Sequence, residues 1–405
     1  MPGRWRTLSF LVSPRVGRCA QTAHGSERKE DLGSPAKDNK LKGQPVSTIG
    51  DRKADHIALC STDAVAFKSK STLFEAVRIV HNALPELSAD EVDPSISLFG
   101  RRLRAPIFIA AMTGGTEHAS RINRELSAIA ADRGYGFGLG SQRPILRDAA
   151  VAPTFDVRKT NGSPNAKNLL LLGNLGMVQA VELGVDGLRA LVDRVEADAL
   201  CIHLNPAMEL VQPGGDRDFR GGLALFETLV ASLGVPVIAK ETGCGLSRSV
   251  AKRLKNVGVS HVDVSGAGGT SWVGVETKRA EEVGDQPSAA LGALLWDWGV
   301  PTAASVMDVA SVGFETIIAT GGVMNGVDVA KALLLGATAA GLARPVLMAL
   351  QQGGRAGAEA FLDQVEAELR AVMLLTGSRD LAALRGAEKI VVGELAAWHS
   401  RPHHA

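Results

Sequence analysis

The sequence has little excess charge of either sign, few cysteines and no long uninterrupted apolar run. Its 44 basic and 43 acidic side chains leave a net charge of +1, which excludes a strong global attraction to nucleic acid but not a local basic pocket. Four cysteines without a CxxC pair indicate a reducing compartment. The most apolar stretch, 332–350, contains Arg344 and Pro345, so it predicts helix, strand and helix rather than a membrane span.

The first fifty residues differ in composition from the rest. Four arginines occur before the first acidic residue, Glu27, and a polar, lysine-containing tract follows. This composition fits a transit peptide, a disordered tail or a start codon assigned too far upstream, and we leave these alternatives open. We expect residues 1–50 to be a basic leader, 51–395 a single barrel domain and 396–405 a tail, in a cytoplasmic protein.

Eight short apolar runs, each bounded by Gly, Pro or Asn, have the length and composition of buried strands. They span residues 106–112, 135–140, 169–176, 199–205, 236–241, 261–266, 315–321 and 339–344. Segments with helical spacing of apolar residues separate them, for example 118–134 and 326–337. Eight strand-helix units predict an α/β fold of the (β/α)8 type, a TIM barrel. A doubly wound sheet is the alternative, but no Gly-rich dinucleotide turn follows the first strand.

Polar residues follow several of these strands, at the end where such barrels carry their chemistry. His203 and Asn205 close the fourth strand and point the same way by the two-residue strand period, and a Gly-rich acidic loop comes soon after. Lys240 closes the fifth strand. A lysine there points into the barrel mouth and needs an anionic or electron-rich partner, for which the N1–C2=O edge of a flavin is suitable.

Phosphate-binding signals cluster after the last two strands. Gly321 and Gly322 precede an Asn-Gly pair and a helix, so backbone N–H groups and a helix N-terminus converge there. The last strand ends in Ala343 and Arg344. Together these segments predict the phosphate cradle that barrels commonly build after strands seven and eight.

Arg52 and Lys53 lie just ahead of the barrel and are followed by His56. Such a cluster is usually only surface charge. A segment that precedes a barrel can fold over its mouth, however, and there the pair would suit a diphosphate because guanidinium binds phosphate oxygens in a forked geometry.

In ordered motifs the chain resembles the type 2, FMN-dependent isopentenyl-diphosphate delta-isomerase family over roughly residues 51–390. The shared motifs include RKADH, MTGG, GSQR, GNLG, HLN with QPxGDRDF, KETGCG, DVSGAGGTSW, TGGVxNGVDVAKAL, GLARP and LLTGSRDLAALR. The resemblance implies a homo-oligomer, a tetramer or octamer, that interconverts isopentenyl and dimethylallyl diphosphate with reduced FMN and Mg2+. It also implies that NADPH reduces the flavin.

The resemblance also assigns residues to these ligands. FMN would be bound by Ala111, Met112, Thr113, Ser141, Asn174, Lys240, Ser265, Thr270, Gly321, Gly322, Val323, Ala343 and Arg344. The prenyl diphosphate would be held by Arg52, Lys53, Arg143, His203 and Asn205. Glu209 would bind magnesium, which prefers hard oxygen ligands and commonly bridges one carboxylate to substrate phosphates.

Three positions depart from the family pattern. Met208 stands where a Gln normally precedes the magnesium-binding Glu, Gly214 where a Glu is usual, and Met324 where an Arg follows the Gly-Gly turn. A thioether cannot donate a proton, so Met208 cannot take over a proton-transfer role. No residue of the chain is therefore assigned as catalytic, and the flavin itself is expected to carry the proton transfers. We expect slow isomerase activity or a related prenyl diphosphate as substrate.

Two rival functions start from the same fold. An FMN-dependent α-hydroxy-acid oxidase needs a His base and a carboxylate-binding Arg, but the matching segment has Ala267 and Thr270 instead. A flavin-binding protein without catalysis would not need Glu209 or the Arg52–Lys53 pair. Both rivals are therefore less favoured than an isomerase.

Overall fold

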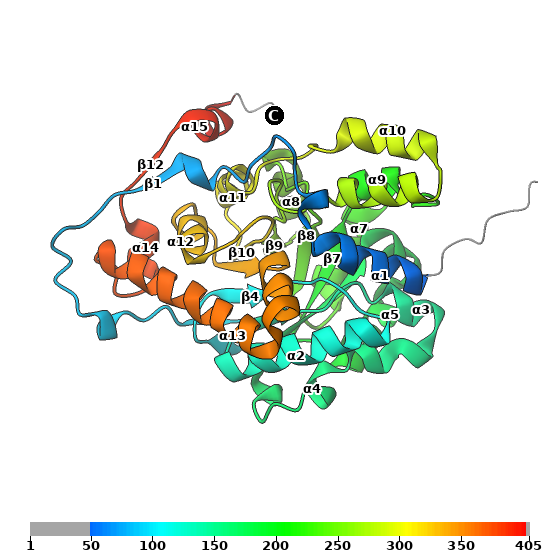
Figure 1. Cartoon of the computed structure of the whole chain (residues 1–405), viewed down its shortest axis with the longest axis horizontal. Helices are drawn as coiled ribbons and strands as arrows, with labels where there is room; N and C mark the ends of the chain where they lie inside the picture. The colour runs from blue at the N-terminus through cyan, green and yellow to red at the C-terminus, as the bar shows by residue number, and fades with distance from the viewer. Residues whose placement is uncertain (1–48, 402–405) are drawn as a thin grey trace, which may run out of the picture. The chain divides into compact units, whose positions relative to one another are not determined.

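The computed structural model describes residues 49–401, with side chains from Asp55 onward, and Figure 1 shows the arrangement of its elements. Eight parallel strands close into a barrel in the order β10-β11-β4-β5-β6-β7-β8-β9. The strands are β4 (Ile107–Ile109), β5 (Gly136–Gly138), β6 (Leu170–Gly176), β7 (Ala199–Leu204), β8 (Val237–Glu241), β9 (His261–Asp263), β10 (Thr316–Ala319) and β11 (Ala339–Leu342). Each falls within a predicted run, so the TIM-barrel prediction is confirmed.

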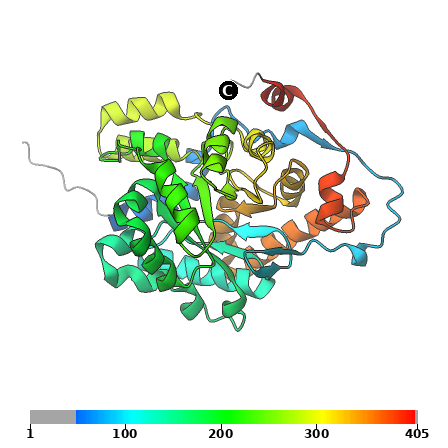
Figure 2. The same ribbon diagram turned by 180° about the vertical axis from the view of Figure 1, so that it is seen from behind.

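Helices separate successive barrel strands and cover their outer faces, as Figures 1 and 2 show from opposite sides. Both faces of each strand are therefore buried, which explains why the strands are continuous apolar runs rather than alternating ones. The helices are α1 (Ile49–Cys60), α2 (Glu117–Arg133), α3 (Arg143–Arg147), α4 (Val157–Thr160), α5 (Met177–Val195), α6 (Pro206–Val211), α7 (Gly222–Ser232), α8 (Arg248–Asn256), α9 (Trp272–Glu282), α10 (Gln286–Leu295), α11 (Thr302–Ala310), α12 (Gly326–Leu334), α13 (Arg344–Leu375), α14 (Leu381–Gly386) and α15 (Gly393–Ser400).

Helix boundaries follow local capping chemistry. The side chain of Thr116 accepts a hydrogen bond from the backbone N–H of Ala119 at the start of α2, and Gly134 ends that helix with φ 68°. At the start of α12, Asn325 accepts from the N–H of Asp328 in the same way. The Asn-Gly pair predicted to lead from the cradle into a helix therefore acts as its N-cap.

The barrel interior is filled by apolar side chains below the level of the predicted site. This interior cluster comprises Leu98, Leu103, Phe108, Leu170, Leu172, Ala199, Cys201, Ile238, Ile318 and Ala339. Leu98 and Leu103 come from an antiparallel hairpin, β2 (Ile96–Leu98) and β3 (Arg101–Leu103), outside the barrel sheet. They pack on residues at the strand starts, so the hairpin closes that end and leaves the carboxyl ends for the site.

Two segments far apart in the sequence pair outside the barrel. Strand β1 (Val77–Ile79) pairs with β12 (Lys389–Val391), and α15 follows β12 across the expected boundary at residue 395. The proposed leader lies almost entirely outside the described residues, so the domain limits stay predictions. Among residues 49–401, no helix is long and apolar enough to cross a membrane. The apolar stretch 332–350 forms parts of α12, β11 and α13, as predicted.

Candidate active site

A cavity of about 240 Å3 lies at the carboxyl ends of the barrel strands. All thirteen residues predicted to bind FMN line it, as do Arg143, His203, Asn205, Met208 and Glu209. Arg52 and Lys53 lie in α1, but their side chains fall outside the described part of the chain. The structure thus brings every predicted site residue with a described side chain into one cavity.

One side of the cavity is built from closely approaching backbone after β9 and β10. A Cβ on Gly269 would lie 2.5 Å from the backbone nitrogen of Gly322, and one on Gly321 would lie 2.2 Å from the carbonyl oxygen of Gly266. Gly321 and Gly322 also have φ of 97° and 71°, which side-chain-bearing residues rarely adopt. Glycine is therefore required at these positions, and the two loops form a cradle with main-chain groups at its surface.

Three buried polar atoms in residues that line the cavity have no hydrogen-bond partner in the described structure: Oγ1 of Thr113, Oγ1 of Thr242 and Nε of Arg344. Buried polar atoms normally find a partner, so these atoms fit a polar ligand. The guanidinium of Arg344 also pairs with Asp63, through the Nη2 atom. The glycine cradle and these donors together fit the phosphate and polar edges of FMN.

Lys240 forms an ion pair with a residue that sequence reasoning missed. Its Nζ lies 2.7 Å from Oδ2 of Asp263 and 3.3 Å from Oγ1 of Thr320, whose hydroxyl donates to the other carboxylate oxygen. All three side chains are buried, and they link β8, β9 and the end of β10. The anionic partner that Lys240 was predicted to need is therefore present within the protein itself.

Glu209 lies in α6 and is 5 % exposed, so it is not a surface helix glutamate. The amide of Asn205 donates to its Oε1 at 3.0 Å, and the backbone N–H of Asp216 donates to its Oε2 at 2.7 Å. Gln212 donates to Oε2 as well, at 3.3 Å. These donors fix the carboxylate, and a carboxylate with about four acceptor positions still has capacity for a cation.

Glu209 is the one carboxylate among the described residues that line the cavity. No group of three or more His, Cys, Asp or Glu residues is placed to hold a metal ion anywhere in residues 49–401. A cation at Glu209 would therefore take its other ligands from water and from a bound anion, which is the usual arrangement for Mg2+.

Arg143 reaches toward the same carboxylate from α3. Its Nη1 lies 3.9 Å from Oε1 of Glu209 and 3.6 Å from Oδ2 of Asp216, which also accepts from Gln179 at 2.7 Å. Sequence reasoning assigned no role to Gln179, or to Asp216 of the QPxGDRDF motif, since neither stands at the end of a strand. Arg143 is balanced by two acidic groups and is still partly exposed at the mouth.

The three departures from the family pattern occupy different surroundings. Met208 lines the cavity, with its sulfur 4.0 Å from Nδ2 of Asn205. Met324 also lines it and is 44 % exposed, while its backbone N–H donates to Asp328. Gly214 has φ 68°, and an added Cβ would meet nothing within 4 Å. Two of the three therefore make the cavity wall more apolar.

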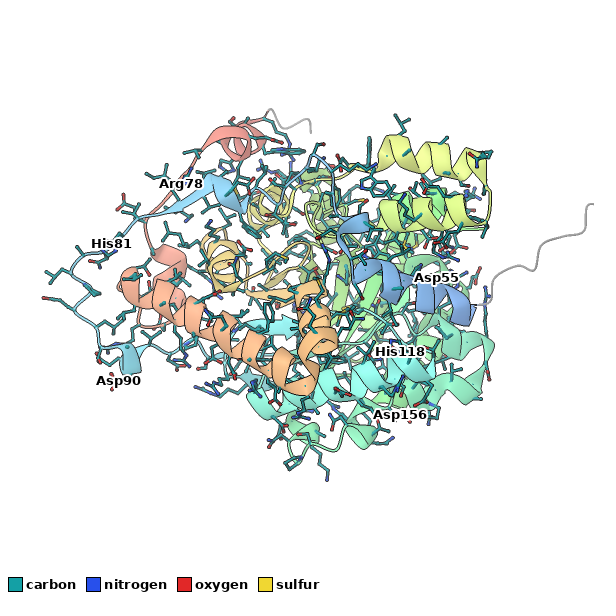
Figure 3. All side chains as sticks on the ribbon, viewed as in Figure 1. Asp55, Arg78, His81, Asp90, His118 and Asp156 are labelled. Carbon is teal, nitrogen blue, oxygen red and sulfur yellow. The ribbon has the colours of Figure 1, made fainter. Side chains whose placement is uncertain are left out.

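Helix α1 packs against α9 near the cavity, and Figure 3 labels Asp55 on it. Nε2 of His56 lies 2.8 Å from Oε1 of Glu276, a fully buried carboxylate, and Arg279 joins Glu276 to Asp55. Burial raises the pKa of Glu276, but the hydrogen bond and charge of His56 and the charge of Arg279 outweigh it and hold that pKa below its usual value. This network fastens the segment that carries Arg52 and Lys53.

Two further ionisable groups near the mouth are dominated by burial. Burial raises the pKa of the Cys60 thiol to about 12, which favours the neutral thiol of this cavity-lining cysteine. Burial also raises the pKa of Glu241 to about 8, although the backbone N–H groups of Cys244 and Gly245 donate to it. Glu241 holds the loop after β8 rather than facing a ligand.

Comparison with known proteins gives a consistent assignment. The model of the FMN-dependent dehydrogenase family matches residues 223–390. Isopentenyl-diphosphate delta-isomerase of Methanosarcina barkeri is 42% identical over 348 residues, covering 86% of this chain and 93% of the relative. The protein of the same name from Synechococcus sp. is 46% identical over 342 residues, covering 84% and 95%.

Solved structures are similar at the level of the fold. A mandelate oxidase mutant with (S)-mandelic acid aligns with a TM-score of 0.57 at 20% identity, covering 84% of this chain and 94% of the other. Another mandelate oxidase variant, with 2-hydroxy-phenylacetamide, aligns with a TM-score of 0.56 at 19% identity, covering 84% and 97%. At this identity the likeness establishes the barrel alone.

The barrel, its cavity and the family match together define an FMN-dependent (β/α)8-barrel enzyme. Within that class, the sequence identity of 42% and 46% to these relatives, over most of both chains, decides the family. The chain belongs to the isopentenyl-diphosphate delta-isomerase family, as its motifs predicted.

Proposed function

We propose that the protein converts isopentenyl diphosphate to dimethylallyl diphosphate with reduced FMN and Mg2+. The observation that carries this proposal is that one cavity at the strand ends combines a glycine cradle, a buried lysine, and Glu209 with its amide partners. The curated relatives bear the name of this activity.

The reaction moves a double bond without oxidation. A proton is added to the terminal alkene carbon, and another is removed from the carbon on the far side of the branch point, through a state with cationic character. When bound and reduced, FMN supplies an anionic π surface and an ionisable nitrogen, N5. The barrel residues must therefore hold the alkene over that surface and exclude water.

Backbone groups after β9 and β10 would hold the flavin phosphate, with Thr113, Ala343 and Arg344 completing the wall. The remaining proposed contacts line the same cavity: Ala111, Met112, Ser141, Asn174, Lys240, Ser265, Thr270 and Val323. Because Asp263 compensates the charge of Lys240, that ammonium would meet a bound flavin as part of a nearly neutral pair. It would supply a directed hydrogen bond more than a net charge.

The diphosphate would lie on the opposite side, near Arg143, His203 and Asn205, with Mg2+ at Glu209. Arg52 and Lys53 belong to the segment fastened by His56 and would add cationic groups for the diphosphate. A protein carboxylate, water and phosphate oxygens are hard oxygen ligands that would suit Mg2+. NADPH is the proposed reductant of the flavin.

Met208 gives the proposal its particular form. A thioether neither donates nor readily accepts a proton, so this side chain adds no acid-base group to the cavity. With Glu209 retained and held by three donors, substrate binding is expected to survive while turnover is slow. A related prenyl diphosphate is the second candidate substrate, because Met208 and Met324 make the wall more apolar.

The test is an anaerobic assay of the purified flavoprotein. Reduced enzyme is supplied with isopentenyl diphosphate and Mg2+, and dimethylallyl diphosphate is measured together with the reductant. We expect many product molecules per enzyme with no net consumption of NADPH. Oxidation of one NADPH per product would instead identify a reductase.

An α-hydroxy-acid oxidase stays the less favoured rival. Such an enzyme would need a His base and an Arg close to the flavin. Ala267 is fully buried and offers no ionisable group, and Thr270 lines the cavity where an Arg would be required. The likeness to mandelate oxidases supports the fold and gives no support to oxidase chemistry. Cytoplasmic location and a homo-oligomeric state, tetramer or octamer, stay predictions.

A further inference from the structure

The side-chain amide of Asn174 has an orientation that its neighbours determine. Asn174 lies in β6 and is buried, and its Nδ2 lies 3.1 Å from the carbonyl oxygen of Leu139. A carbonyl oxygen only accepts hydrogen bonds, so the amide nitrogen must face it. The amide oxygen, Oδ1, therefore faces the other way, toward Nδ1 of His203 at 2.9 Å.

Gln142 holds the backbone of Asn174 in place. The backbone N–H of Asn174 donates to Oε1 of Gln142 at 2.9 Å, and the N–H of Gln142 donates to the carbonyl oxygen of Asn174 at 2.8 Å. Gln142 is fully buried. The backbone of Asn174 is thus held at two points and its side-chain amide at one, the Leu139 carbonyl, and none of these contacts involves His203.

This orientation decides which nitrogen of His203 carries hydrogen. Because Oδ1 of Asn174 is an acceptor only, Nδ1 must be the donor. A neutral imidazole has one N–H, so Nε2 of the neutral ring is an acceptor. Free histidine favours the other arrangement, with hydrogen on Nε2, so the protein imposes the less common tautomer.

The ring is also positioned by β6. His203 is the register partner of Gly176, and a Cβ added at Gly176 would lie 3.1 Å from Nε2 and 3.4 Å from Cε1. Glycine at 176 therefore leaves room for the imidazole at the cavity edge. Asn174 and Gly176, both in β6, therefore act on the tautomer and on the position of the ring.

We propose that Asn174 is a positioning residue that holds neutral His203 as its Nδ1–H tautomer, so that a proton taken up by the ring is carried on Nε2. This inference deepens the proposed function and rests on it for one consequence: the proton on Nε2 would be donated to a diphosphate oxygen. A phosphate oxygen without hydrogen cannot form a hydrogen bond with an Nε2 that carries no hydrogen either. The role is additional to the flavin contact that the resemblance implies.

The tautomer can be read directly from the FMN-loaded protein without substrate. The experiment is 15N NMR of the protein labelled at histidine, at alkaline pH where the ring is neutral, with the signal assigned by its loss in His203→Gln. We expect Nδ1 of His203 to be protonated and Nε2 to be the unprotonated nitrogen. Hydrogen on Nε2 in the native protein would overturn the proposal.

Two variants separate this role from a general structural one. Asn174→Asp keeps an acceptor beside Nδ1, so the Nδ1–H signal should persist, whereas Asn174→Leu removes the acceptor, so the hydrogen should move largely to Nε2. Loss of the signal in both variants, or its retention in both, would contradict the proposal. Should Asn174→Leu not fold, the native protein and Asn174→Asp still decide.

The spectra require no turnover, so they stand apart from the proposed isomerase activity. An inactive protein with the Nδ1–H tautomer would contradict the proposed function and leave the positioning role of Asn174 intact. An active isomerase with hydrogen on Nε2 would contradict the positioning role and support the proposed function.

Discussion

The two sides of the barrel mouth present polar groups by different means. After β9 and β10, Gly269, Gly321 and Gly322 bring main-chain atoms so close together that any side chain would collide. At the ends of β6 and β7 and in α6, side chains are presented in hydrogen-bonded pairs, Asn174 with His203 and Asn205 with Glu209. The first side depends on the absence of side chains, and the second depends on partners. Substitutions should therefore disrupt the glycine side by steric collision and the other side by the loss of hydrogen-bond partners.

The largest effect is expected where the two sides are joined. Asp263→Asn removes the carboxylate that compensates buried Lys240, and breaking a buried ion pair costs about 3–5 kcal/mol. We expect the free energy of unfolding, measured by urea denaturation, to fall by about that amount. The matched control is Asp186→Asn on the surface of α5, where the carboxylate is 97% exposed and the change should stay within about 0.5 kcal/mol. If the free energy of unfolding falls by less than about 1 kcal/mol in Asp263→Asn, the Lys240–Asp263 pair does not stabilise the junction between the two sides.

On the glycine side, Gly269→Ala should weaken FMN binding. The added Cβ would lie 2.5 Å and 2.6 Å from backbone atoms of Gly322, which can move only by opening the cradle. Overpacking of this kind costs about 1–3 kcal/mol, so we expect roughly tenfold to hundredfold weaker binding in flavin fluorescence titrations. Gly353→Ala is the control, because nothing lies within 4 Å of a Cβ there. Unchanged affinity in Gly269→Ala would mean that the flavin phosphate is held elsewhere.

On the side of the mouth that presents side chains, Glu209→Gln should weaken Mg2+ binding and leave FMN binding unchanged. The amide keeps the shape of the carboxylate but loses its charge, so we expect the Mg2+ concentration for half-maximal turnover to rise by about 10–100-fold. Flavin absorbance should be retained. Glu227→Gln, at an exposed position of α7, is the control that should leave both properties unchanged. Equal loss of flavin and magnesium would indicate that the two sides do not act separately.

The smallest expected effect is an increase in turnover in Met208→Gln. This substitution places an amide 3 residues from Asn205, whose Nδ2 already faces position 208. We expect turnover to rise roughly tenfold, below the usual effect of an ionising acid–base group, because an amide positions a proton without itself ionising. Initial rates of dimethylallyl diphosphate formation measure it, with Met324→Gln as the comparison at the outer wall. Formation of a different prenyl product by the unaltered protein would argue that position 208 sets substrate choice instead.

The backbone side was the easier one to predict from the sequence. Each barrel strand is an apolar run that is buried on both faces, and the Gly-Gly turn followed by an Asn-Gly helix start has a local conformational cause. Such signals lie within a few residues of one another. The fold and the cradle therefore followed from local patterns.

On the side of the mouth that presents side chains, the sequence predicted which residues belong to the site but not which residues they pair with. Lys240 was predicted to need a partner, yet Asp263 lies 23 residues away, and His56 and Glu276 are 220 residues apart. One signal was available: Asp263 interrupts an apolar strand, and a buried carboxylate requires a cation or donors. Asp216 belongs to the QPxGDRDF motif, but nothing in the sequence pairs it with Gln179, because their roles arise only when α5 and the loop after α6 meet at Arg143.

The central claim is that the cavity moves protons and leaves the flavin's electrons in place. It is tested most directly by running the anaerobic reaction in D2O, with reduced FMN enzyme, Mg2+ and isopentenyl diphosphate, and analysing the product by mass spectrometry. The account predicts dimethylallyl diphosphate that carries solvent deuterium and exceeds the reductant added by many fold. Product without deuterium, or product limited to the amount of reductant, would contradict it.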